Sequence, residues 1–242
     1  MKLLAFSSRT AREILRDPLN LFFGLGFPLV LLFLLSAIQA NVPVPMFEIT
    51  HLSPGVAVFG LAFLTLFAAQ LVAKDRESAL LQRLYTTPLT AVDFILGYLL
   101  PVLPMAVAQG IVCYAAALCL GLELNAGILW GLLALLPVAM FYVSLGLLCG
   151  SAMNVKAVGG VCGALLTNLS AWLSGIWFDV ALVGGWFEKL AGVLPFLHAV
   201  ELERAALAGD LAAALPHLWW VLGYAVVTAA GAVGLFLRQM RQ

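Results

Sequence analysis

The sequence predicts an all-α membrane protein with six transmembrane helices. Two observations predict it: 64% of the residues are apolar and only 10% are charged, and several long runs contain no charged residue. About a quarter of the residues of soluble globular domains are charged. A helix needs about 20 apolar residues to cross a bilayer. A water-soluble fold is therefore excluded, and residues 1–242 are predicted to form a single transmembrane domain.

Six apolar runs define the predicted spans. They are residues 19–38, 54–73, 94–120, 127–150, 157–178 and 218–237. An even number of crossings places both termini on one side of the membrane. Ten of the twelve Lys and Arg residues fall on that side, and only Lys189 and Arg204 fall on the other. Because basic residues concentrate in cytoplasmic segments, we expect a multi-pass protein of the inner (plasma) membrane with both termini in the cytoplasm.

Residues 1–17, before the first span, are predicted to form an amphipathic helix that lies in the membrane interface. At the helical spacing of about 100° per residue, its leucines fall on one arc. Arg9, Arg12 and Arg16 fall on the opposite arc. We expect these arginines to face lipid headgroups or a cytoplasmic partner.

Residues 75–86 join the second and third spans and are rich in helix-forming residues. Leu80 and Leu84 share one arc of this predicted cytoplasmic helix, whereas Arg76 and Arg83 lie on the other arc. The segment is therefore predicted to be a cytoplasmic helix rather than a passive loop.

Glu77 does not fit that pattern, because it falls among the leucines. A carboxylate on an apolar face is costly unless it is paired. We therefore hypothesise that Glu77 pairs with an arginine, for example one from the N-terminal helix.

The fifth predicted span carries small residues every four positions, including Gly159 and Gly163. Such a ridge lets another helix backbone approach closely, either within the chain or in a second copy. Residues 181–208, before the last span, are predicted to form two short helices. They break near Gly184 and at Pro195, and they lie at the outer surface or dip into the membrane as a re-entrant hairpin.

Few polar side chains lie within the predicted spans. Gln109, Thr167 and Asn168 either bond to a neighbouring helix or line a substrate path at a dimer interface. A path so poor in charge favours an apolar or amphipathic cargo such as a drug or a lipid. No metal ligands are predicted among these residues, and a net charge of zero gives no reason to expect nucleic acid as a partner.

The order of these segments resembles the type-2 ABC exporter permeases (ABC-2 type). The resemblance is carried by Asp75-Arg76-Glu77 and Thr87-Pro88-Leu89 around the predicted cytoplasmic helix, and more weakly by Leu194-Pro195 and Glu203-Arg204. Ser78 and Leu81 depart from the family's usual Gly and Glu.

The resemblance implies a dimeric permease, formed with an identical or similar chain, that docks a cytoplasmic ATPase. Its coupling helix would carry Arg76, Glu77, Leu80, Arg83 and Leu84. ATP and Mg²⁺ would bind to the partner, because the chain has no Gly-x-x-x-x-Gly-Lys-Ser/Thr sequence. The chain itself is therefore expected to be non-catalytic and to hold no cofactor.

Two alternative classes were weighed. An ion-coupled secondary transporter usually holds an ionisable residue inside a span, and none lies near the middle of a predicted span. An intramembrane enzyme needs its catalytic groups at one depth, but His51, His198 and His217 all lie outside the spans. Both classes are therefore disfavoured, and no catalytic residue is predicted.

Overall fold

The computed structural model describes residues 2–78 and 90–240, and the regular elements within these ranges are all helices. The first half of the chain holds α1 (Lys2–Leu15), α2 (Pro18–Leu21), the π-helical η1 (Phe22–Gly26), α3 (Phe27–Asn41), the 3₁₀ turn η2 (Pro45–Phe47), α4 (Ile49–Glu77) and α6 (Ala91–Cys119). The second half holds α7 (Gly127–Ala152), α8 (Val155–Val158), the π-helical η3 (Gly159–Leu166), α9 (Thr167–Leu173), α10 (Val180–Val183), α11 (Gly185–Val193), α12 (Pro195–Leu207) and α13 (Leu211–Met240).

Five helical stretches in the described residues are long and apolar enough to cross a membrane. They are Phe22–Asn41, Ile49–Glu77, Ile95–Cys119, Gly127–Ala152 and Leu211–Gln239. Each overlaps a predicted span, so the helical, membrane-spanning fold class is confirmed. The predicted span at residues 218–237 starts too late, because α13 begins at Leu211 and continues through Pro216.

The predicted span at residues 157–178 is not among these five stretches. It consists of α8, η3 and α9 in succession. The π-helical turn of η3 is wider than an α-turn, and such turns interrupt an otherwise regular helix. The helix ends at Leu173, shortly before Gly175, whose φ of 69° is a conformation that glycine adopts without strain. The predicted end at residue 178 is therefore wrong.

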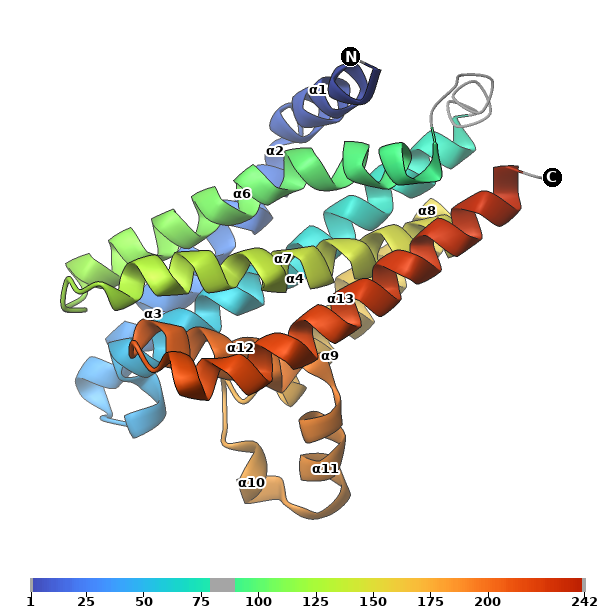
Figure 1. The fold of residues 1–242 in the computed structure, drawn as a ribbon. Coiled ribbons are helices and arrows are strands. Elements are labelled where there is room, and N and C mark those ends of the chain that lie inside the picture. Colours follow the sequence, from blue (N-terminus) through green and yellow to red (C-terminus); the bar gives the residue numbers. More distant parts are fainter. Residues whose placement is uncertain (1, 79–89, 241–242) are drawn as a thin grey trace.

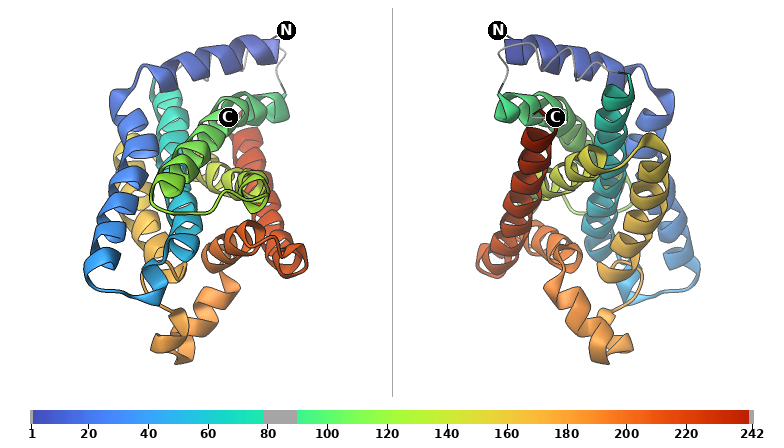
Figure 2. Two further views of the ribbon diagram at one scale, coloured as in Figure 1. Left: turned by 90° about the vertical axis from the view of Figure 1, so that its left-hand side faces the viewer. Right: turned by 90° about the vertical axis from the view of Figure 1, so that its right-hand side faces the viewer.

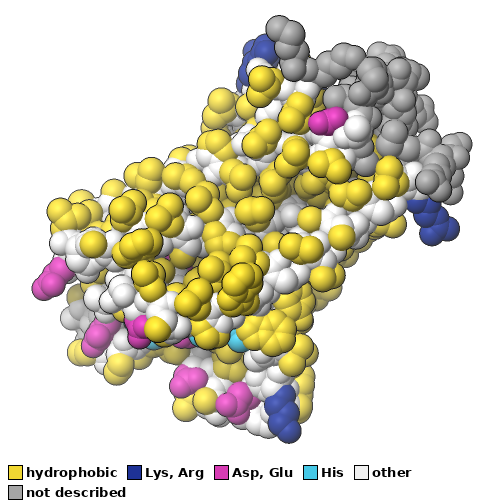
Figure 3. All heavy atoms as spheres, viewed as in Figure 1, with side chains coloured by type: hydrophobic (Ala, Val, Ile, Leu, Met, Phe, Trp, Pro, Cys, Tyr) yellow, Lys and Arg dark blue, Asp and Glu magenta, His cyan; other side chains and the backbone are white. Residues whose placement is uncertain are grey.

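The helices form one bundle with the two termini at the same end. In Figures 1 and 2, α1 lies across that end of the bundle, while α10, α11 and α12 lie at the opposite end. Figure 3 shows apolar side chains over most of one face, with Lys and Arg at both ends and most of the visible Asp and Glu toward the end away from the termini. The surface therefore has an apolar middle between two charged ends.

The centre of the bundle is the crossing of α4 and α7. α4 is buried along nearly all of its length. At Gly146 of α7 a Cβ atom would lie 2.4 Å from the backbone oxygen of Thr65, and at Gly150 it would lie 2.4 Å from that of Ala69. Because both contacts are to backbone, only glycine fits at these two positions. This small-residue crossing brings α7 against α4, and the sequence analysis did not identify it.

The glycines that were predicted to pack are more open. A Cβ at Gly159 would meet no atom within 4 Å, and one at Gly163 would meet only Leu66, at 3.4 Å. No described residue of this chain therefore packs against Gly159. Gly163 makes an ordinary van der Waals contact with a side chain of α4.

The hairpin before the last span is built from three helices. α10, α11 and α12 cover residues 180–207, with breaks at Gly184 and before Pro195. Gly184 and Gly185 both have positive φ angles, which gives the chain a sharp turn between α10 and α11. α12 contacts α4, α7 and α13, so it belongs to the bundle rather than to a loose loop.

Candidate coupling site

The polar residues that end α4 form a connected group at the end of the bundle that holds the termini. Asp75, Arg76 and Glu77 occupy the last turn of α4, directly before residues 79–89, which lie outside the described part of the chain. The predicted helix starting at residue 75 is therefore corrected. These three residues continue the second span, and Ser78 ends it by donating from its hydroxyl to the Asp75 carbonyl at 3.2 Å.

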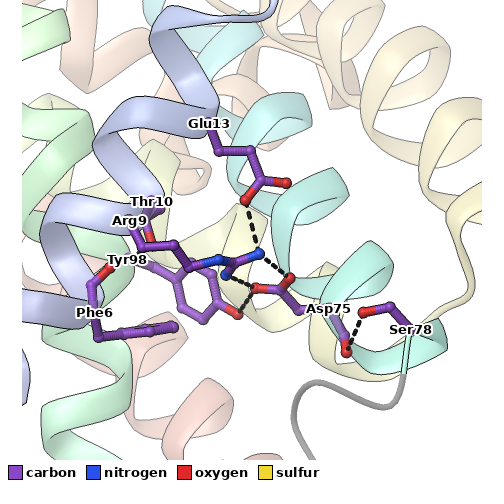
Figure 4. A network of polar contacts seen from close by, with 7 residues as sticks. All are labelled: Phe6, Arg9, Thr10, Glu13, Asp75, Ser78 and Tyr98. Carbon is purple, nitrogen blue, oxygen red and sulfur yellow. Dashed lines mark hydrogen bonds and ion pairs between the residues drawn. The ribbon is translucent and has the colours of Figure 1, made fainter.

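Asp75 is the centre of this group (Figure 4). Asp75 is 2% exposed, and its carboxylate accepts two hydrogen bonds from the Arg9 guanidinium, at 2.7 and 2.8 Å. The Tyr98 hydroxyl donates a third, at 2.6 Å. Paired, bidentate contacts of this kind fix direction as well as distance. One carboxylate therefore ties α1 and α6 to the end of α4.

The packing around Arg9 holds α1 in place. Phe6 stacks edge-on against Tyr98, with ring centroids 5.0 Å apart. Glu13 forms a second ion pair with Arg9 at 2.9 Å. The hydrogen bond to Asp75 raises the pKa of Arg9, and burial opposes that rise. Arg9 therefore stays charged and binds inward, whereas the sequence analysis expected it to face headgroups or a partner.

Arg76 and Glu77 bind the connection between α7 and α8. Arg76 donates to the carbonyl oxygens of Gly150 and Met153 at 2.9 and 3.1 Å, and Glu77 accepts from the Val155 amide at 3.0 Å. Arg76 contacts the C-terminal end of α7, and Glu77 contacts the N-terminal end of α8. A cation is favourable at the first kind of helix end and an anion at the second, because of the helix dipole. These two residues therefore fix where α8 begins.

Among the described residues, Glu77 forms no ion pair with an arginine, and its carboxylate accepts from the Val155 backbone amide instead. The carboxylate that meets an arginine of the N-terminal helix is Asp75. This difference from the hypothesis arose from the helix boundary, because α4 continues to Glu77 and its register turns Asp75 inward. Sequence reasoning also missed Tyr98, whose position on α6 becomes informative only once α4 is extended.

The remaining predicted coupling residues are Leu80, Arg83 and Leu84, and they lie outside the described residues. Arg12 and Arg16 border a groove of about 570 Å³ at the elbow between α1 and α2, together with Glu13, Asp17 and Pro18. Arg12 donates to Ser8. Neither arginine forms an ion pair with a described residue, so both charges remain open to an anionic neighbour.

Each of the predicted path residues donates a hydrogen bond to a backbone carbonyl. Gln109 is buried, and its amide donates to the Ala57 carbonyl of α4 at 3.0 Å. Thr167 bonds to the Cys162 carbonyl at 3.0 Å, and Asn168 bonds to the Ala164 carbonyl at 2.7 Å. Gln109 thus joins two helices, whereas the other two bond within their own stretch.

The geometry allows mechanical work rather than chemistry. The last turn of α4 holds α1, α6, α7 and the start of α8 through direct hydrogen bonds. The site is therefore a joint at the end of the bundle that holds the termini.

Comparison with known proteins identifies the family of this chain. A family model described as ABC-2 type transporter matches residues 1–208. The chain is 29% identical over 125 residues to the capsule polysaccharide export inner-membrane protein CtrC of Neisseria meningitidis serogroup A, covering 51% of this chain and 47% of that protein. The serogroup B protein of the same name is 28% identical over 141 residues, covering 57% and 53%.

The chain thus spans about half the length of the curated relatives it matches. The family match is broader, since it includes α1, the candidate coupling site and the helices up to α12. With inner-membrane relatives and five apolar helices, this is a multi-pass inner-membrane protein. The chain belongs to the ABC-2 type transporter family.

Proposed function

We propose that this chain is the permease subunit of an ATP-driven exporter. Subunits of this family are non-catalytic membrane components, and a separate ATPase hydrolyses ATP. The observation that carries the proposal is the joint at the end of α4, which links four helices to the segment where such an ATPase would dock. ATP and Mg²⁺ would bind to that partner. This chain would convert the partner's movement into helix movement.

In this proposal the chain crosses the membrane six times, with both termini in the cytoplasm. Residues 155–173 provide the sixth crossing, since at 1.5 Å per residue they cover about 28 Å, close to the roughly 30 Å of a hydrocarbon core. The end that holds the termini also carries most of the Lys and Arg side chains, which supports the orientation. The hairpin of α10, α11 and α12 then lies on the outer side.

We propose a polysaccharide-type cargo with an amphipathic or lipid-like part. The names of the relatives support a saccharide part of the cargo, because both are capsule polysaccharide export proteins. The charge-poor spans support the lipid-like part. A deletion strain distinguishes the alternatives: loss of surface polysaccharide with unchanged drug sensitivity supports this cargo, and the reverse result supports a drug.

The docking proposal predicts that Leu80→Asp combined with Leu84→Asp abolishes co-purification of the ATPase. Two carboxylates in an apolar contact leave buried charges without partners, which is costly. Pull-down from solubilised membranes measures the effect. The matched control is Leu182→Asp at the other end of the bundle, where the side chain is 82% exposed. Retention of the ATPase by the double variant would contradict docking through this segment.

We further propose that a second permease copy packs on the side of α4 that carries α3 and the α8–α9 stretch. Both flank α4 on the side away from α13 (Figure 2). Their outward side chains include Phe33, Leu165 and Trp172, each about half exposed. Gly159 and Gly160 are open on this side, where a second backbone could approach.

Cross-linking tests this arrangement. In a background without native cysteines, Gly160→Cys is expected to form a disulfide-linked dimer in membranes on mild oxidation, because the two copies meet there. The control is Gly223→Cys on α13, which is equally open but lies on another face. A dimer band from the control alone would place the second copy elsewhere.

A further inference from the structure

Glu203 is a carboxyl group buried deep within the bundle. It lies on α12, has no exposed surface, and accepts a hydrogen bond from the Tyr114 hydroxyl of α6 through Oε1. Its other oxygen, Oε2, has no partner among the described residues. Gly131 of α7 closes the site, since a Cβ there would lie 3.0 Å from Oε1. This carboxyl group is held by one neutral donor and by apolar packing.

Among the residues that the structure describes, no cation forms an ion pair with Glu203. Arg204 follows it in sequence but turns away, donating to Glu201 at 2.8 Å and to the Gly175 carbonyl at 3.1 Å. An isolated carboxylate in such surroundings is far less stable than the neutral acid. Burial accordingly raises the pKa of Glu203 well above its ordinary value, and the Tyr114 hydrogen bond only partly opposes this.

The other titratable groups around α12 are engaged elsewhere. His217 of α13 bonds to His198 of α12 at 2.8 Å, and the backbone carbonyl of His51 on α4 accepts from Arg204 at 3.4 Å. The charged residues of the adjoining helix α11 are Glu188 and Lys189, and neither contacts Glu203. Among the described groups, only Tyr114 therefore acts directly on this carboxyl group.

The position of α12 relates the protonation of Glu203 to the movement of this helix. At about 1.5 Å per residue, α12 is only about 20 Å long, so it enters the bundle without crossing it. We call its packed position against α4, α7 and α13 its seat. Because α12 lies at one end of the bundle, a displacement out of the seat toward that end would bring Glu203 into water. In water the carboxyl group has its ordinary pKa and ionises, whereas in the seat it stays neutral.

We propose that Glu203 is a proton-binding site that links the seating of α12 to the pH of the compartment that this helix faces. The seated helix holds one proton taken from that water, and the displaced helix returns it. A group whose pKa is raised in the seated state stabilises that state below its ordinary pKa and stops doing so as pH rises through the raised value. Acid therefore favours the seated helix.

The identity of the compartment rests on the proposed orientation, but the linkage itself does not. Hydrogen exchange of residues 195–207, measured on the full chain in lipid nanodiscs without an ATPase, exposes both membrane faces to one buffer. A failure of the proposed export function would therefore leave this result unaffected.

The variant Glu203→Gln keeps an acceptor for Tyr114 and removes the titration. Comparing wild type with this variant at each pH cancels the intrinsic pH dependence of exchange. The ratio of their exchange rates is expected to be pH-independent below the ordinary pKa of glutamate, about 4.3. It should rise by up to about tenfold per pH unit between that value and the raised pKa, and level off above the raised pKa. Glu201→Gln, on the same helix but outside the buried site, is expected to retain the wild-type pH dependence. A ratio that stays constant over the whole range would overturn the proposal.

A second measurement does not need the variant to fold. The infrared spectrum of the wild-type chain near neutral pH is expected to contain the carbonyl band of a protonated carboxylic acid. Tyr114→Phe should shift this band, because it removes the hydrogen bond to Oε1. A spectrum without any protonated acid would overturn the proposal independently of the exchange data.

Discussion

Replacing Asp75 with alanine is expected to destabilise the folded bundle by about 3 kcal/mol. The substitution leaves the Tyr98 hydroxyl, which is buried, without its acceptor and deprives Arg9 of two hydrogen bonds. Breaking a fully buried pair costs about 3–5 kcal/mol, and the lower end applies because the Arg9 side chain is 39% exposed and can reach water. Reversible unfolding in mixed micelles measures the change.

The matched control for this variant is Glu13→Ala. Glu13 also pairs with Arg9, but its side chain is 38% exposed, and exposed pairs contribute at most about 1 kcal/mol. Asp75→Asn should fall between the two, because it keeps an acceptor for Tyr98 and loses the charge. If Asp75→Ala proved no more harmful than Glu13→Ala, the central role given to Asp75 would be wrong.

Gly146→Ala is expected to be the second most damaging change, with a loss of about 2 kcal/mol. The added methyl group would lie 2.4 Å from the Thr65 carbonyl oxygen, so α7 must move away from α4 along the whole crossing. The greater helix propensity of alanine offsets part of this loss. The free energy of unfolding and transport in the reconstituted complex should fall together.

Gly223→Ala on α13 is the matched control for crowding, because its Cβ would meet no atom within 4 Å. It makes the same chemical change in a helix of the same bundle. We expect little change in unfolding free energy from it. Equal losses from both variants would mean that backbone flexibility, rather than the α4–α7 contact, accounts for the effect.

The helical fold was predictable because it follows from composition alone. Long apolar runs must satisfy their backbone groups internally once they enter a membrane, and a helix achieves this within one segment. The helix breaks at Gly184 and Pro195 could also be predicted from the local sequence. The crossing at Gly146 could not, since a small residue shows that close approach is possible but not which helix approaches.

The candidate site was predictable only in outline. The sequence pointed to the acidic and basic residues after the second span, but it assigned the buried carboxylate to Glu77 rather than to Asp75. A difference of two residues turns a helical position by about 200°, so an error in where one helix ends reverses inside and outside. Tyr98 and Arg9 lie far from Asp75 in sequence, and only the tertiary contact relates them.

The inward-facing Arg9 also matters for handling the protein. Shortened versions lacking α1 would expose the Asp75 carboxylate without its arginine, bonded only to the Tyr98 hydroxyl, on the flank of α4 and α6, where detergent tails cover a charge poorly. Affinity tags belong at the other terminus for the same reason, because a bulky fusion beside α1 would strain its docking.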